Sequence, residues 1–250
     1  MRIIDLGTCL ALLGAAIALP AVALTQAVAP PVESAPLPAT QKRAALRNPA
    51  AAFWRVRAPD TAYLEMETSR GTISVALIRE WAPHGVDRFY NLARAGYFDD
   101  SRFFRVLPWY IAQFGIAGDP AVYAIWSRRK IPADSVRTTN ARGTLSFAQY
   151  SPSERTTNVF INLRDSPTLD SLGFAPIGRV VAGQEAADSL YSGYGETPSM
   201  AAPIGNPRRL YGESNRYLDR AFPRLDRIVR ITVQARSVPG AMKDSVPRSP

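Results

Sequence analysis

Residues 62–78, AYLEMETSRGTISVALI, alternate apolar and polar side chains on both sides of Ser69-Arg70-Gly71. Alternation of this kind predicts a strand with one buried face, and two such runs joined by a short glycine-containing turn are typical of a β-hairpin. Further short strands are predicted at residues 102–107, 110–114, 144–149, 158–163, 177–181 and 227–234. About eight short strands with turn-rich joins favour a closed antiparallel barrel or a sandwich.

Two helices are predicted between these strands. The first follows Pro83 and stops at Gly96, and its apolar side chains recur at helical spacing: Val86, Phe89, Tyr90, Leu92 and Ala93. The second covers residues 184–191. A further helix is expected at 213–221, within a segment, 193–226, whose role the sequence leaves open. The predicted fold class is therefore mainly β with a minor helical part.

Length and composition indicate one ordinary domain. The chain has 250 residues, 46% of them hydrophobic, which is enough to bury a single core. Its net charge of +9 comes from 30 Lys and Arg against 21 Asp and Glu, spread along the chain with small clusters at 128–130 and 208–209. A nucleic-acid-binding surface needs basic residues gathered on one face. A solvated basic surface is therefore favoured, and no nucleic-acid partner is expected.

The first 23 residues are predicted to be a secretory signal peptide. They contain Arg2, an apolar run and then Ala21-Val22-Ala23, a small-x-small cleavage site. The alternative is an uncleaved N-terminal membrane anchor, since the apolar run is nearly long enough to span a bilayer. Cleavage after Ala23 would remove Cys9, the only cysteine. An exported domain without disulfides suits a bacterial periplasm or cell envelope, with no stable membrane insertion once the signal is removed.

Composition also divides the rest of the chain. Residues 24–61 are assigned to a linker, proline-rich at 29–40 and basic at 41–57, where a short helix is expected. Residues 62–236 form the predicted domain, and 237–250 are predicted to be a disordered tail.

Few side chains are available for covalent or metal-assisted catalysis. His84 is the only histidine and is expected at the surface, so a Ser-His-Asp triad and a His/Cys zinc site are both disfavoured. Asp99-Asp100 and Gly118-Asp119-Pro120 are interpreted as turns. No cofactor and no metal are expected, and an enzyme built on this chain would have to work without a nucleophile or a general base.

Arg105 lies in RFFRVLPWYIAQFG, residues 102–115, among aromatic and aliphatic side chains and ahead of Gln113. Rotation about the bond before proline needs only a group that favours the twisted amide, because its barrier of about 20 kcal/mol is amide resonance. A guanidinium could donate a hydrogen bond to the proline nitrogen in that twisted state. The alternative interpretation is a strand arginine paired with a carboxylate, beside core aromatics.

Two motifs carry a resemblance to a known family. Residues 89–115, FYNLARAGYFDDSRFFRVLPWYIAQFG, resemble the cyclophilin pattern in which a helix leads to G-Y-[YF], then R-V-[IL]-P, an aromatic residue and a glutamine. Residues 143–190, beginning GTLSFAQ and continuing through NVFINL and TLD to GRV, resemble the second cyclophilin signature. The two motifs occur in the family's order and at matching separation.

The resemblance implies a peptidyl-prolyl cis-trans isomerase with a closed eight-stranded antiparallel barrel capped by two helices. It implies no cofactor, proline-containing polypeptides as partners and a monomer. The position of the family's catalytic arginine is Arg105. The substrate-binding positions that it implies are Tyr110, Ile111, Gln113, Ala148, Gln149, Asn158, Phe160, Leu169 and Phe174.

The chain departs from the family pattern at the rim of the implied pocket. Asn158 replaces a glutamine, and Thr168 replaces a tryptophan that in cyclophilins is associated with cyclosporin binding. Either Gly173 or Phe174 stands where a histidine often lies. Two alternatives to an isomerase therefore stay open: a non-catalytic cyclophilin-like chaperone or scaffold, and a basic envelope protein that binds anionic lipid or nucleic acid.

Overall fold

The computed structural model describes residues 37–195 and 207–234. The predicted signal peptide, the linker before residue 37 and the predicted tail lie outside the described residues. Within them, eight strands form one antiparallel sheet in the order β3-β4-β6-β5-β7-β2-β1-β8. The strands are β1 (Thr61–Thr68), β2 (Gly71–Ile78), β3 (Arg105–Leu107), β4 (Ile111–Phe114), β5 (Thr144–Phe147), β6 (Val159–Asn162), β7 (Pro176–Ala182) and β8 (Ile228–Val233). All eight predicted strands are confirmed, most of them with shorter bounds.

The sheet is a curled half-barrel with β3 and β8 at its two edges. A single bridge, Arg102 to Arg227, connects the segments that precede these edge strands. Backbone hydrogen bonds flank it, from Phe103 N to Asp226 O at 2.9 Å and from Ile228 N to the oxygen of residue 101 at 2.8 Å. The mainly β architecture is confirmed, whereas full closure of the barrel stays a prediction.

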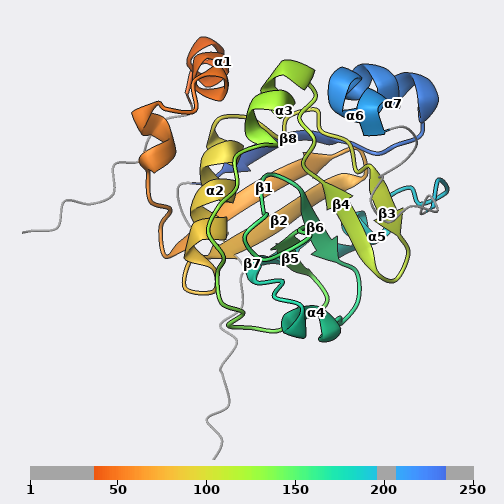
Figure 1. The fold of residues 1–250 in the computed structure, drawn as a ribbon. Helices are drawn as coiled ribbons and strands as arrows, with labels where there is room; N and C mark the ends of the chain where they lie inside the picture. Colours follow the sequence, from red (N-terminus) through yellow and green to blue (C-terminus); the bar gives the residue numbers. More distant parts are fainter. Residues whose placement is uncertain (1–36, 196–206, 235–250) are drawn as a thin grey trace, which may run out of the picture. The chain divides into compact units, whose positions relative to one another are not determined.

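Helix α2 (Pro83–Arg94) covers the inner face of the sheet and contacts β2, β7 and β8 (Figure 1). Its Val86, Phe89 and Leu92 are completely buried, and the Phe89 ring stacks on Phe98 at 4.8 Å between centroids. Each such side chain contributes about 1.5–3 kcal/mol to the free energy of unfolding through burial. The buried faces of the predicted strands and of the predicted helix thus pack into one hydrophobic core.

Besides α2, the described residues contain six further α-helices, so both helices expected from the sequence are present and others accompany them. The other six are α1 (Ala39–Arg47), α3 (Pro120–Trp126), α4 (Thr168–Ser171), α5 (Gln184–Asp188), α6 (Pro207–Glu213) and α7 (Asn215–Ala221). Helix α5 is shorter than predicted, and Ser214, with a φ of 46°, separates the expected 213–221 helix from α6. None of the helices described combines the length and apolar character required to cross a bilayer.

The segment before β1 packs on the domain and is more than a linker. It contains α1 and the 3₁₀ helix η1 (Ala52–Arg55). The Trp54 ring lies 4.2 Å from that of Trp126, and Trp126 donates its indole N–H to the carbonyl of Leu46 at 2.9 Å. The folded unit therefore begins before residue 62, the boundary predicted from the sequence. The segment before that boundary is held by tertiary contacts of tryptophans and alanines, and composition alone does not predict such contacts.

Candidate active site

Arg105, Gln113 and Phe160 lie side by side across three neighbouring strands. In the sheet register Arg105 of β3 faces Gln113 of β4, and Gln113 faces Phe160 of β6. Directly opposed residues of antiparallel strands project from the same face. The Arg105 guanidinium donates from Nη1 to Oε1 of Gln113 at 3.3 Å. The guanidinium thus shares one face of the sheet with the Phe160 ring, with Gln113 between them.

A second hydrophobic cluster, separate from the main core, forms around this row. Its buried members are Ile111, Phe160 and Leu169, which are 4%, 3% and 6% exposed. Partly buried residues pack around them: Leu107, Tyr110, Ala148 and Phe174. Six of these seven residues are among the substrate-binding positions implied by the sequence, and the structure brings them together.

Phe174 rather than Gly173 contributes the side chain to this cluster. The Phe174 ring meets Phe160 edge-on at 5.8 Å between centroids, a favourable aromatic arrangement. Gly173 has a φ of +80°, a backbone conformation that glycine adopts without strain, and so makes the turn that presents Phe174.

A buried polar network fixes this turn to the sheet. The Asn140 side chain donates to Asp170 Oδ1 at 2.7 Å and to the Phe174 carbonyl at 2.8 Å, and it accepts from the Ser146 hydroxyl of β5 at 2.8 Å. Burial acts to raise the pKa of Asp170, but hydrogen bonds from Thr139 and Asn140 outweigh it and leave the pKa below its usual value. Asp170 is therefore a carboxylate at neutral pH and holds α4, which carries Leu169, in place.

At three positions implied by the sequence, polar groups lie beside the cluster, in the chain that follows β5 and precedes β6. Ala148 donates its backbone N–H to the carbonyl of Asn158 at 2.9 Å. Gln149 donates from Nε2 to the carbonyl of Gly173 at 3.0 Å. Gln149 Oε1 and Asn158 Oδ1 are both buried, and neither has a hydrogen-bond partner among the described residues. Each is an acceptor that lacks the partner that burial normally requires.

Sequence reasoning missed Trp109, in the turn between β3 and β4. Its side chain is 78% exposed, and its φ of 61° lies in the left-handed region. A bulky residue in that region stores about 1–3 kcal/mol of strain. The signal was the position of a large aromatic residue between two predicted strands, at 107 and 110, where a turn must place it outside the core.

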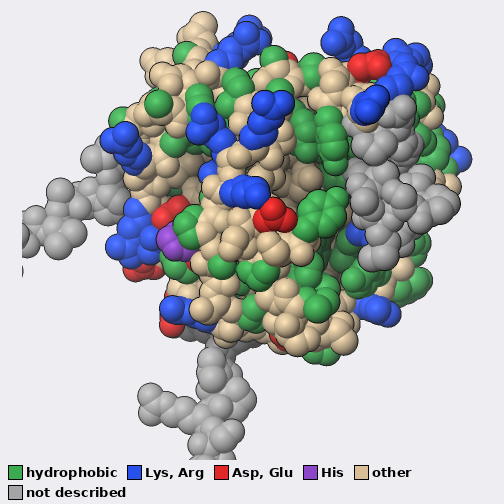
Figure 2. Space-filling model, in the orientation of Figure 1, with side chains coloured by type: hydrophobic (Ala, Val, Ile, Leu, Met, Phe, Trp, Pro, Cys, Tyr) green, Lys and Arg blue, Asp and Glu red, His purple; other side chains and the backbone are tan. Residues whose placement is uncertain are grey.

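Charged side chains do not assemble a metal site in the described ranges. No three His, Cys, Asp or Glu side chains gather there closely enough to hold an ion. What the candidate site offers is one fixed guanidinium, an apolar floor and two buried acceptors. On the face seen in Figure 2, basic side chains are scattered, and hydrophobic side chains gather where Figure 1 places β4.

Comparison with known proteins decides the family. The profile described as cyclophilin type peptidyl-prolyl cis-trans isomerase/CLD matches residues 63–207. The chain belongs to the cyclophilin family. Peptidyl-prolyl cis-trans isomerase A of Dickeya dadantii is 33% identical over 139 residues, 53% of this chain and 73% of the relative. Peptidyl-prolyl cis-trans isomerase ppi1 of Schizosaccharomyces pombe is 33% identical over 148 residues, 57% of this chain and 92% of the relative.

A solved structure agrees in fold. A cyclophilin type peptidyl-prolyl cis-trans isomerase of Cryptosporidium parvum aligns with a TM-score of 0.51 at 19% identity, covering 72% of this chain and 99% of the other. All ten candidate site residues of this cyclophilin lie inside the matched range 63–207, whereas α1, η1 and α7 lie outside it.

Proposed function

We propose that this cyclophilin is an active peptidyl-prolyl cis-trans isomerase that assists protein folding, with Arg105 as its catalytic residue. The observation that carries the proposal is the cross-strand row of Arg105, Gln113 and Phe160 above a separate apolar cluster. The cluster seats the pyrrolidine ring of a substrate proline. The guanidinium beside it donates to the proline nitrogen, which accepts a hydrogen bond only when the amide is twisted.

The surrounding polar groups orient the substrate backbone. Gln113 accepts a hydrogen bond from Arg105 and so limits the directions in which the guanidinium points. The unpartnered acceptors of Gln149 and Asn158 would take N–H groups of a bound peptide, which offsets the cost of their burial. Pre-organisation of this kind lowers the barrier without any proton transfer or covalent step.

A protease-coupled or NMR exchange assay on a short Xaa-Pro peptide tests this function. The purified protein should accelerate cis-trans exchange catalytically. The alternative, a non-catalytic cyclophilin-like chaperone or scaffold, predicts that the same peptide binds while its exchange rate stays at the uncatalysed value. Binding without acceleration would therefore replace the first proposal by the second.

We propose further that the protein is a bacterial, exported member of the family, monomeric in the periplasm or cell envelope, and that its sheet closes as a complete barrel. The cleavage triplet Ala21-Val22-Ala23 supports export, and the bridge between Arg102 and Arg227 supports closure. The mature chain should begin at Leu24. Mass spectrometry of the native protein that finds an intact Met1 in the membrane fraction would favour the N-terminal anchor instead.

A further inference from the structure

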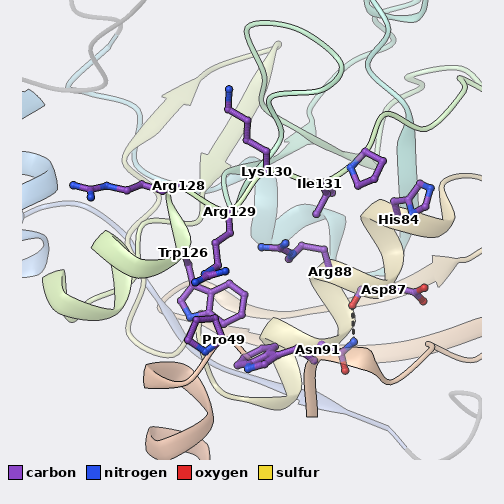
Figure 3. Close-up of a pocket in the computed structure, with 12 residues that line it drawn as sticks. Pro49, His84, Asp87, Arg88, Asn91, Trp126, Arg128, Arg129, Lys130 and Ile131 are labelled. Atoms are coloured by element: carbon purple, nitrogen blue, oxygen red, sulfur yellow. Dashed lines mark hydrogen bonds between the residues drawn. The ribbon is translucent and has the colours of Figure 1, made fainter. Parts of the chain in front are cut away.

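A pocket of about 500 Å³ lies between η1, α2 and the chain that follows α3 (Figure 3). None of the ten candidate site residues lines it. Its volume falls in the range of small-molecule sites, about 300–1,000 Å³. Basic and aromatic side chains dominate its lining: Arg88, Arg128, Arg129, Lys130, Trp54 and Trp126.

Arg88 is the innermost of the basic groups. Its guanidinium carbon lies 5.3 Å from the centroid of the Trp126 ring, and its Nη1 is buried without a hydrogen-bond partner among the described residues. In Figure 3 the Arg88 guanidinium points toward the Arg129 side chain, whose own guanidinium lies beside the indole of Trp126. Two positively charged groups thus lie close together beside the Trp126 ring.

The acidic groups nearby are already neutralised. Asp87 lines the pocket, but Arg79 donates to both of its carboxylate oxygens at 2.9 Å. Glu154 pairs with Lys130 at 2.7 Å. Among the described residues, no carboxylate forms a salt bridge with Arg88 or Arg129.

Two cationic groups that lie close together raise the free energy of the folded protein unless an anion lies between them. Burial, and to a smaller extent the positive charge of Arg129, together lower the pKa of Arg88 to about 10. Arg88 is still protonated at neutral pH, so the pocket holds a desolvated charge that lacks a counterion. An anion bound between the two guanidinium groups would offset both effects.

We propose that this pocket binds a phosphate group that carries a small apolar or aromatic moiety. A bidentate contact with one guanidinium engages both oxygens of a carboxylate, whereas a phosphate monoester has three terminal oxygens and a charge of about −2, which suits a bridge between Arg88 and Arg129. Trp54 and Trp126 offer flat surface to the attached moiety. The phosphate comes either from a soluble phosphate ester or from a lipid headgroup, and both share this chemistry.

Calorimetry at constant ionic strength tests the proposal with inorganic phosphate and with phenyl phosphate. Phenyl phosphate should bind more tightly than inorganic phosphate, because its ring can lie on the indoles. Arg88→Gln and Arg129→Gln should each weaken binding by about tenfold or more. Arg216→Gln removes the same charge from an exposed position on α7 outside the pocket, so affinity should change by less than about twofold.

Further measurements separate the phosphate sources. Co-sedimentation with phosphatidylglycerol vesicles, against phosphatidylcholine vesicles, detects headgroup binding. If only the anionic vesicles bind, and the two pocket variants lose this binding, the phosphate source is a lipid. If the soluble phosphates bind as predicted and the anionic vesicles do not, the source is a phosphate ester.

Absence of binding to all of these probes, or an equal loss in Arg216→Gln, would overturn the proposal. Since Arg129 is exposed, Arg129→Gln should fold even if Arg88→Gln does not. Unchanged prolyl isomerisation in Arg129→Gln would show that the two sites are independent.

Discussion

Arg105 and Arg88 are two arginines set beside aromatic side chains, on different elements of the same domain. Arg105 stands on a strand, and the opposed Gln113 accepts its hydrogen bond at 3.3 Å. Arg88 stands on α2, stacks on Trp126, and leaves its buried Nη1 without a partner among the described residues.

The difference concerns how each guanidinium is held. A neighbouring acceptor on a rigid sheet fixes the direction of donation before any substrate binds, which suits a reaction that requires transition-state complementarity. A guanidinium that only stacks on a ring is oriented less strictly and remains costly to bury until an anion arrives. This difference is why we propose catalysis for the first arginine and anion binding for the second.

Replacing Arg105 should have the largest effect. Arg105→Ala should lower kcat/KM for prolyl isomerisation by about 10²–10³-fold, the usual loss when one pre-organised transition-state donor is removed. Arg105→Lys should also lose about tenfold or more, because an ammonium on a flexible stem does not reproduce the planar fork. The measurement is peptide exchange kinetics, with circular dichroism to verify folding.

Arg216→Ala provides the matched control for the loss of one arginine. Its activity should equal that of the wild type. Turnover near the wild-type value in folded Arg105→Ala would disprove the assigned role of Arg105.

The strands, and the run that contains Arg105 and Gln113, could be predicted because each depends on residues close together in the chain. Alternation placed β1 and β2, and the short run from Arg105 to Gln113 contains both partners of the hydrogen bond that orients the guanidinium. The length of the turn sets the register of this hairpin, and the three-residue turn observed places Arg105 opposite Gln113. The resemblance then supplied Phe160 and Leu169, which no local pattern connects to Arg105.

The regions that sequence reasoning missed depend on tertiary contacts. Asp119-Pro120 was interpreted as a turn, although Asp119 caps α3 by accepting from the N–H of Ala121 at 2.8 Å. An N-cap aspartate followed by proline is a helix-start signal that was available. Trp54 and Arg88 both stack on Trp126, although the three residues are far apart in the chain. No periodicity of the sequence predicts such a contact.

The second prediction concerns the rim of the proline site. Thr168 begins α4, next to the buried Leu169, and is exposed. It offers far less apolar area than the tryptophan usual in cyclophilins, so cyclosporin should inhibit about ten- to a hundredfold more weakly than it does with that tryptophan present. Thr168→Trp should recover part of this affinity in an inhibition assay. Tight inhibition of the unmodified protein would show that the rim contact is energetically minor.

A third, smaller effect is expected at Gln113. Gln113→Leu removes the acceptor that orients Arg105, and kcat should fall by about tenfold, the equivalent of one hydrogen bond to a charged group. Gln113→Glu keeps an acceptor at this position and should retain more of kcat. If both variants change KM alone and by the same factor, Gln113 acts on the substrate and does not position the arginine.

The smallest effect is expected from Arg88, and its sign distinguishes the two arginines. Arg88→Met removes a desolvated charge and keeps an unbranched apolar side chain against Trp126, so the loss of the cation-π contact is offset by relief of the burial cost. At pH 7 in phosphate-free buffer, the free energy of unfolding measured in urea should rise by about 1 kcal/mol. Because the folded-state pKa of Arg88 is depressed to about 10, the cost of its charge is fully present at this pH and disappears only above that value.

The control is Arg129→Met at an exposed position, which should change the free energy of unfolding by less than about 0.5 kcal/mol. A clear loss of stability in Arg88→Met would mean that the guanidinium stabilises the fold as it stands, and the contrast with Arg105 would fail.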